Sequence, residues 1–124
     1  MIDATNPVLA DLSGLTLGTT VSAGEQVQQW ASGAKVVKAF NTIGSNILAD
    51  ARFGSERALL AYCGDDAEAK HIVRQLAEEL GFDPLDAGPL TQTRLLEPFA
   101  LLWISLAYKA GQGRDIAFKF LRRS

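Results

Sequence analysis

Short apolar runs that alternate with helix-like segments are the feature that most constrains the fold of this chain. "KVVKAF" (Lys35–Phe40) and "RALLAYC" (Arg57–Cys63) are apolar and partly β-branched, which is typical of buried strands. A charged amphipathic segment follows the second run and ends near Gly81. Because strands separated by helices indicate βαβ units, the sequence predicts an α/β fold with a mainly parallel sheet and flanking helices.

Capping residues mark the first two helices. "SAGE" at Ser22 to Glu25 fits a capping box and predicts a helix to about Ser32, where Gly33 ends it. A turn and a short helix are expected over Thr42–Ala49. Between the chain start and the first helix, residues 8–21 are rich in Gly, Thr and Ser and are expected to form a loop.

The amphipathic segment after the second strand predicts a helix capped by Asp65 or Asp66 and stopped at Gly81. Its apolar positions are spaced three and four residues apart on one face, and they are Ile72, Val73, Leu76, Ala77 and Leu80. "FDPLDAG" then predicts a short strand. Since Pro84 cannot donate to a strand ladder, that strand is expected at a sheet edge.

The longest helix is predicted from Thr91 to about Ala110, with Pro98 marking either a kink or the true start. Large residues give it a wide apolar face, namely Leu95, Phe99, Leu102, Trp103 and Leu106. Such a face is expected to pack on the sheet or on another chain. The last stretch, 114–121, alternates apolar residues with others and favours a strand over a helix.

Composition bounds the class of protein. The chain has 124 residues, 48% hydrophobic and 21% charged, so residues 1–124 are expected to form one globular domain. Net charge is −2 and the basic residues are scattered, which argues against a nucleic-acid surface. The uncharged segment from Pro98 to Tyr108 is too short to span a bilayer, and no basic leader precedes an apolar stretch, so a cytoplasmic location is expected.

The turns after the strands are where a parallel sheet would bind a ligand. They are Asn6-Pro7, Asn41-Thr42-Ile43-Gly44, Gly64-Asp65-Asp66 and Gly88-Pro89. We expect these turns to share one end of the sheet. The Asn41–Gly44 turn has two interpretations: Gly44 lets the backbone approach a flat ligand, or Thr42 caps the next helix and Gly44 turns the chain.

Other chemistry-bearing residues favour structural roles. The adjacent carboxylates of Asp65 and Asp66 are explained by helix capping, and a metal site lacks a histidine at suitable spacing. Cys63 is expected to be a buried small hydrophobe and His71 a surface residue. "GQGRDI" from Gly111 to Ile116 starts like a dinucleotide fingerprint, but it follows a predicted helix and Ile116 replaces the last glycine.

Six motifs in order carry a resemblance to a known family: "DATNP", "KVVKAFNTIG", "CGDD", "ELGFDPLDAGPL", "RLLEP" and "FKFL". Nearly the whole chain resembles the carboxyl-terminal part of NADPH-dependent oxidoreductases that reduce the deazaflavin coenzyme F-420. The ferric reductase domains of six-transmembrane metalloreductases share the pattern. The resemblance implies a partial Rossmann-like fold and ancestral hydride transfer between NADPH and a deazaflavin or flavin, with iron as a third acceptor.

Site residues follow from the resemblance position by position. Thr5, Asn6 and Pro7 match the turn beside the nicotinamide ribose, and Asn41, Thr42, Ile43 and Gly44 match the stretch against the nicotinamide and deazaflavin rings. Gly88 and Pro89 match a turn lining the same crevice, and Leu121 matches a position near the deazaflavin. Hydride transfer between stacked rings requires positioning and exclusion of water, so no acid, base or metal ligand is expected.

Family members begin with a G-x-G-x-x-G half that this chain lacks; it starts where the family's fourth strand is ending. Because that half carries the diphosphate cradle, NADPH binding by this chain alone is expected to be weak or absent. The first strand would be a bare edge, which favours a homodimer through that edge and the apolar helix faces. The alternatives are a non-catalytic homodimerising interaction module and half of a split enzyme completed by a separate chain.

Overall fold

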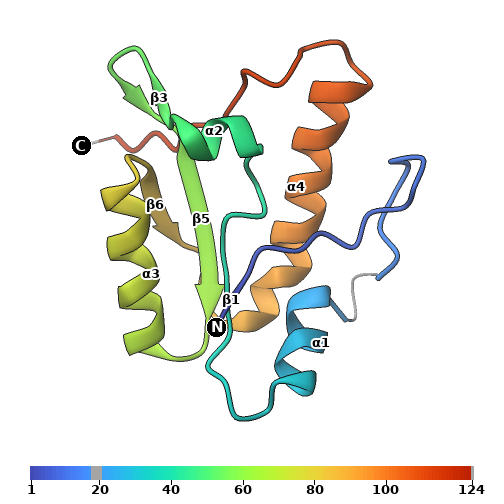
Figure 1. The fold of residues 1–124 in the computed structure, drawn as a ribbon, viewed down its shortest axis with the longest axis vertical. Coiled ribbons are helices and arrows are strands. Elements are labelled where there is room, and N and C mark those ends of the chain that lie inside the picture. The colour runs from blue at the N-terminus through green and yellow to red at the C-terminus, as the bar shows by residue number, and fades with distance from the viewer. Residues whose placement is uncertain (18–20, 124) are drawn as a thin grey trace.

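The computed structural model describes residues 1–17 and 21–123 (Figure 1). The part of the expected loop at 18–20 lies outside the described residues, and 8–17 is irregular apart from an isolated bridge between Val8 and Leu15. The elements are, in order, β1 (Ile2–Asp3), α1 (Ala23–Trp30), β2 (Val37–Lys38), α2 (Ser45–Ala49), β3 (Arg52–Phe53), β4 (Glu56–Arg57), β5 (Leu59–Gly64), α3 (Ala67–Glu79), β6 (Asp83–Asp86), the 3₁₀ turn η1 (Leu90–Gln92) and α4 (Thr93–Tyr108).

Four strands form one sheet in the order β1-β2-β5-β6, which confirms the predicted edge position of β6. β1 pairs with β2, and β5 with β6, in parallel, so the sheet is mainly parallel as expected. β2 and β5 run antiparallel, with Val37 opposite Gly64 and Lys38 opposite Cys63. The carboxyl ends of β1 and β2 therefore lie at one end of the sheet and those of β5 and β6 at the other.

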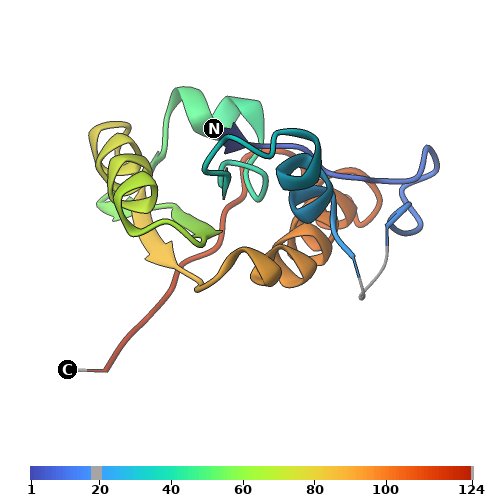
Figure 2. The same cartoon turned by 90° about the horizontal axis from the view of Figure 1, so that it is seen from below.

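Helices cover both faces of this sheet. α3 lies on one face, and α1 and α4 lie on the other, as two perpendicular views show (Figure 1, Figure 2). The side chains of β5 alternate between the faces: Leu60 and Tyr62 join the larger apolar cluster with α3, whereas Ala61 and Cys63 pack with Leu96 of α4. The sheet thus separates two layers of core.

The capping predictions for α1 and α3 are confirmed. Ser22 Oγ accepts a hydrogen bond from Glu25 N at 3.1 Å, which is the N-cap half of the predicted capping box, and the Ser22 hydroxyl itself donates to Glu25 Oε1 at 3.0 Å. Asp66 caps α3 by accepting from Ala69 N at 2.8 Å. Beyond the end of α3, Gly81 has a φ of +90°, a conformation that favours glycine.

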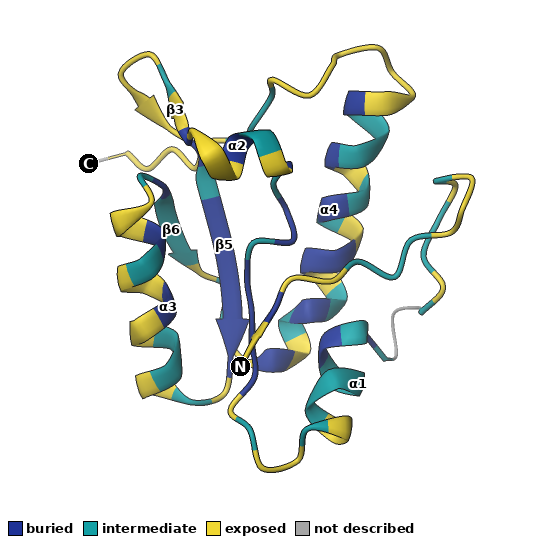
Figure 3. Cartoon of the chain, in the orientation of Figure 1, coloured by how far each residue is buried: buried dark blue, intermediate teal, exposed yellow. Residues whose placement is uncertain are grey.

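The buried faces of α3 and α4 are narrower than predicted (Figure 3). On α3, Ile72 is 59% exposed and Leu80 is 42% exposed, because the sheet contacts only the stripe around Val73 and Ala77. On α4, Leu95 and Leu102 are exposed; the buried positions are Thr93, Leu96, Glu97, Ala100, Trp103 and Ala107. Pro98 lies inside α4, so it does not mark the helix start.

Three other differences concern strands. β2 is shorter than the predicted run because Phe40 takes a left-handed φ of +65° and turns the chain away. The hairpin of β3 and β4 around Gly54-Ser55 was not predicted. The strand predicted over 114–121 is wrong: this tail is extended and Phe118 O accepts from Leu59 N at 2.9 Å, but it forms no strand.

In the part of the chain that the structure describes, no helix is both long and apolar enough to cross a membrane. α4 has 16 residues, which is shorter than a span through the hydrocarbon core of a bilayer requires.

Candidate functional site

Two of the predicted turns meet at the carboxyl ends of β1 and β2. Asn6 Nδ2 donates to Asn41 O at 2.8 Å, and Asn41 Nδ2 donates to Asn6 Oδ1 at 3.2 Å. These reciprocal bonds join residues 35 positions apart in the chain. We call these two residues the Asn6–Asn41 pair, and the structure thus brings the Thr5–Pro7 and Asn41–Gly44 turns together.

Asn41 is buried, with 4% of its surface exposed, and its side chain is directed by α4 as well as by Asn6. Its Nδ2 group also donates to Leu96 O at 3.1 Å. Among the described residues no donor reaches Asn41 Oδ1, although this atom is buried. An acceptor without a partner in such a place is costly unless a water or ligand donor supplies the bond.

Phe40 precedes this turn in a conformation that a bulky residue rarely adopts, with φ of +65°. Its ring packs edge-on against Phe82 with the ring centroids 6.3 Å apart, so Phe40 points to the α3 side of the sheet. Asn41 points to the α4 side and contacts Leu96. Backbone strain at such a position often accompanies a functional turn.

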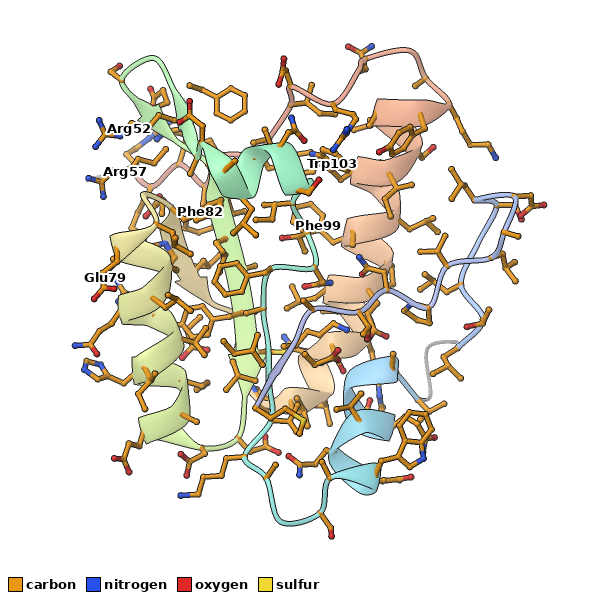
Figure 4. All side chains as sticks on the ribbon, viewed as in Figure 1. Arg52, Arg57, Glu79, Phe82, Phe99 and Trp103 are labelled. Carbon is orange, nitrogen blue, oxygen red and sulfur yellow. The ribbon has the colours of Figure 1, made fainter. Side chains whose placement is uncertain are left out.

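Gly44 lies against Trp103 of α4, which is labelled in Figure 4, and not against an open space. A Cβ atom built on Gly44 would lie 2.6 Å from Trp103 Cη2 and 2.7 Å from Asn46 Oδ1. The indole is held in place because Trp103 Nε1 donates to Ile116 O at 2.8 Å. Gly44 is also the N-cap of α2, so Thr42 is not its cap. Close packing by Trp103 is therefore sufficient to explain the glycine.

The remaining turns lie at the other end of the sheet, so the expectation that all four turns share one end is wrong. Gly64 N donates to Gly88 O at 3.1 Å, which places the Gly88-Pro89 turn beside the end of β5. The cause is the antiparallel pairing of β2 with β5, which the sequence pattern did not reveal. Ile43 stays with the first turn and packs against the α3-side core.

Leu121 lies in the extended tail and is 79% exposed. One open hollow of about 460 Å³ lies beside this tail. It is lined by Leu59, Arg74, Asp83, Pro84, Leu85, Asp86, Phe120 and Arg122, none of which is a predicted site residue. A smaller hollow of about 230 Å³ lies between α4 and the tail and includes Trp103 and Phe118. Leu121 is thus not brought to the Asn6–Asn41 pair.

A buried group of charged side chains lies next to the Asn6–Asn41 pair, and the sequence analysis did not identify it. Lys38 Nζ is 2.9 Å from Asp3 Oδ2 and 2.8 Å from Glu97 Oε2, and all three side chains are almost fully buried. Lys38 Nζ also donates to Thr5 O. Two signals in the sequence pointed to this group: a lysine inside an apolar strand, and a glutamate on the apolar face of a helix.

Both carboxylates of this group have further donors. Asp3 Oδ1 accepts from Thr5 N at 3.0 Å and from Thr5 Oγ1 at 2.7 Å. Burial alone would raise the pKa of Asp3, but the hydrogen bonds from Lys38 and Thr5 outweigh it and lower the pKa below its usual value. Glu97 accepts from Ala23 N at 2.8 Å and Gly24 N at 3.0 Å, the first amides of α1. The group therefore joins β1, β2, α1 and α4.

Cys63 and His71 have the positions expected of them, whereas Asp65 has a different role. Cys63 is buried, and burial raises the pKa of its thiol to about 12, so it is not a thiolate at neutral pH. Asp65 does not cap α3, as Asp66 does, but its Oδ1 accepts from Leu90 N at 2.9 Å; His71 is exposed. Within the described residues no three His, Cys, Asp or Glu side chains form a metal-binding group. "GQGRDI" is a loop after α4, not a turn from strand to helix.

Comparison with known proteins relates this fold to oxidoreductases, although no family model matches the chain. Metalloreductase STEAP3 of Rattus norvegicus is 36% identical over 102 residues, which are 82% of this chain and 20% of that protein. F420-dependent NADP reductase of Methanocaldococcus jannaschii is 35% identical over 89 residues, which are 71% of this chain and 40% of that protein. The chain thus spans less than half the length of either relative.

Solved structures agree with this relation. A protein of Arthrobacter sp. FB24, assigned as an F420-dependent NADP reductase, superposes with a TM-score of 0.86 at 33% identity, covering 98% of this chain and 56% of that one. A hypothetical protein of Sinorhizobium meliloti superposes with a TM-score of 0.65 at 34% identity, covering 72% and 44%. The fold thus defines a partial Rossmann-like α/β protein. This chain is homologous to part of the F420-dependent NADP reductases.

Proposed function

We propose that this chain supplies the nicotinamide side of a site for hydride transfer between NADPH and a deazaflavin or flavin. The observation that carries the proposal is the Asn6–Asn41 pair, whose buried acceptor Asn41 Oδ1 has no donor among the described residues. A nicotinamide carboxamide has the N–H donors that such an acceptor lacks. The relation to a protein named F420-dependent NADP reductase supports this choice of substrates.

The chain's residues would bind and orient the cofactor. Asn6 and Asn41 would hold the nicotinamide end, with the buried Thr42 beside them. When bound, NADPH supplies the hydride. These residues contribute rigidity and exclusion of water, which is the contribution that transfer between two rings needs from a protein.

The diphosphate is proposed to bind elsewhere. A diphosphate site of this class needs a glycine turn leading from a strand into a helix. The only segment resembling that fingerprint within the described residues is the loop after α4. We therefore propose that NADPH binds this chain weakly unless further residues of the same polypeptide, or residues of another chain, complete the site.

A second candidate is a non-catalytic homodimerising module, and the exposed apolar side chains of α4 favour it. Leu95 and Leu102 are 62% and 49% exposed, and at the β1 edge Met1 and Ile2 are 59% and 42% exposed. Because apolar groups in such positions favour association, a dimer through the β1 edge and α4 is proposed in either case. Completion by a separate chain carrying the diphosphate cradle is the remaining alternative, and iron remains a third acceptor.

A titration of the purified protein distinguishes these functions. NADPH, the deazaflavin and FMN are added separately and binding is followed by fluorescence, with Asn41→Leu as the site variant and Asn46→Leu as its control. Saturable binding that Asn41→Leu weakens and Asn46→Leu keeps supports the hydride-transfer site. No binding of any of the three at millimolar concentration overturns it for this chain and leaves the interaction module or the split enzyme.

A further inference from the structure

We propose that Lys38, held between Asp3 and Glu97, is a positioning residue for the Asn6–Asn41 pair. The role of the pair in binding nicotinamide rests on the proposed function. The positioning itself is independent of any ligand, because it follows from contacts within the chain. The two can therefore be tested separately.

The ammonium group of Lys38 is fully used within the protein. It donates to Asp3 Oδ2 at 2.9 Å, contacts Glu97 Oε2 at 2.8 Å, and donates to the backbone carbonyl of Thr5. An ammonium has three N–H donors, so none remains for a substrate or cofactor. Since its side chain is also 0% exposed, Lys38 acts through its neighbours and is not a catalytic residue.

These acceptors are next in sequence to the groups that hold the pair. Thr5, whose carbonyl accepts from Lys38, precedes Asn6. Glu97 follows Leu96, whose carbonyl accepts from Asn41 Nδ2. Lys38 itself lies three residues before Asn41 on the same chain segment. One side chain therefore sets the relative positions of all three backbone segments that surround the pair.

The two carboxylates are themselves held, so the group is rigid as a unit. Asp3 is bound by the backbone N–H and the hydroxyl of Thr5. Glu97 is bound by Ala23 N and Gly24 N at the start of α1. Gly24 is packed so closely on Thr93 of α4 that a Cβ would lie 2.5 Å from Thr93 Cγ2. Rotation of either carboxylate would break bonds to a second element.

The stability of the fold alone does not require the charges of Asp3, Lys38 and Glu97. Buried ion groups can often be replaced by uncharged residues without loss, whereas removal of one member leaves an uncompensated charge. What an apolar side chain at position 38 cannot supply is a donor to Thr5 O. Loss of that donor is expected to free the Thr5–Pro7 turn even when the fold survives.

The test is hydrogen exchange of the Asn41 side-chain amide, followed by NMR in the full chain. The triple variant Asp3→Asn, Lys38→Met, Glu97→Gln removes all three charges while Asn and Gln keep acceptor oxygens. In the folded variant, the exchange rate of this amide is expected to rise about tenfold or more. This increase corresponds to the loss of about one to two hydrogen bonds that stabilise the closed state. The matched control is Glu25→Gln, Arg94→Met, which removes the ion pair of 2.7 Å at the α1–α4 contact. The control is expected to leave Asn41 exchange unchanged.

Two outcomes overturn the proposal: a folded triple variant with wild-type Asn41 exchange, or equal acceleration in the control. If the triple variant does not fold, Lys38→Met alone decides by the same readout in its folded population, since it removes the donor to Thr5 O. Unchanged exchange in that variant also overturns the proposal. Absence of NADPH binding would contradict the proposed function only, because the exchange experiment contains no ligand. If NADPH binds, the triple variant should bind it about tenfold more weakly than the control does.

Discussion

At the scale of single residues, the packing near the candidate site depends on the absent side chain of Gly44 and on the buried ammonium group of Lys38. Gly44 leaves the space that the Trp103 indole fills, and Lys38 places one ammonium among three acceptors. Both positions lie on the segment that follows β1 in the sheet and leads into α2. Their substitution should therefore affect the same region in different ways.

Gly44→Ala is expected to lower the free energy of unfolding by about 1–3 kcal/mol, the usual cost of overpacking a closed site. The added Cβ would lie 2.6 Å from Trp103 Cη2. Urea denaturation measures the change. Gly33→Ala is the control, because no atom lies within 4 Å of its Cβ position. Equal effects of the two substitutions would contradict the packing role of Gly44.

Lys38→Met is expected to cost about 3–5 kcal/mol, because it leaves Asp3 and Glu97 buried without their shared cation. Lys70→Met, which removes an ion pair of 3.0 Å with the half-exposed Asp86, should cost less than about 1 kcal/mol. Chemical denaturation of both variants at neutral pH provides the comparison. A cost for Lys38→Met no larger than that for Lys70→Met would show that the buried group does not hold the fold together.

At the scale of elements, α1 and α4 are joined to the sheet by carboxylates. The Glu97 carboxylate accepts hydrogen bonds from the first backbone amides of α1. The Glu25 carboxylate of α1 accepts from Arg94 Nε and Nη2 of α4, at 2.7 and 2.8 Å. The hydrogen bond from Arg94 lowers the pKa of Glu25, and the bonds from Lys38 and Thr5 lower that of Asp3. The contact between these helices and the sheet therefore depends on ionised acids.

This contact should weaken in acid. A carboxyl whose pKa is lower in the folded than in the unfolded state stabilises the fold above the unfolded pKa, which is about 3.9 for Asp and 4.3 for Glu. That stabilisation is lost as the pH falls through the lowered folded values of Asp3 and Glu25. The free energy of unfolding should therefore decrease below about pH 4. Asp3→Asn should reduce this slope, and an identical slope in wild type and variant would contradict the assignment to Asp3.

Sequence patterns located most elements because those elements depend on local signals. The Ser22 box and the Asp66 cap are local hydrogen bonds, and β5 is an apolar run long enough to identify. The direction of β2 relative to β5 depends on tertiary pairing, which local patterns do not contain. The Asp3–Lys38–Glu97 group was missed for the same reason, since its members come from three distant segments.

The candidate site was predicted to a similar extent. Asn6 and Asn41 were both named, and the structure joins them by two hydrogen bonds. Gly88 and Leu121 were grouped with them because the resemblance implies one crevice, and the antiparallel pair in the sheet separates Gly88 from them. The resemblance supplied the residues, but only the sheet topology could place them.

At the scale of the whole molecule, apolar side chains on two surfaces favour association. In the single chain, solvent reaches Leu95 and Leu102 on α4 and Ile2 on β1. We expect light scattering to give the mass of a dimer, and Leu102→Glu to shift it towards the monomer. Leu80→Glu, at the 42% exposed C-cap of α3, is the control and should leave the mass unchanged. A strictly monomeric wild type would contradict the dimer.

The central claim is that the Asn6–Asn41 pair is the nicotinamide side of an NADP site. Its most direct test is an NMR titration of the isotope-labelled chain with NADPH up to millimolar concentration, because residue-resolved shifts locate even weak binding. The account predicts saturable changes at the Asn41 side-chain amide and the Thr42 backbone amide, removed by Asn41→Leu. Shifts confined to the hollow beside β6 and the tail, or no shifts at all, would contradict it.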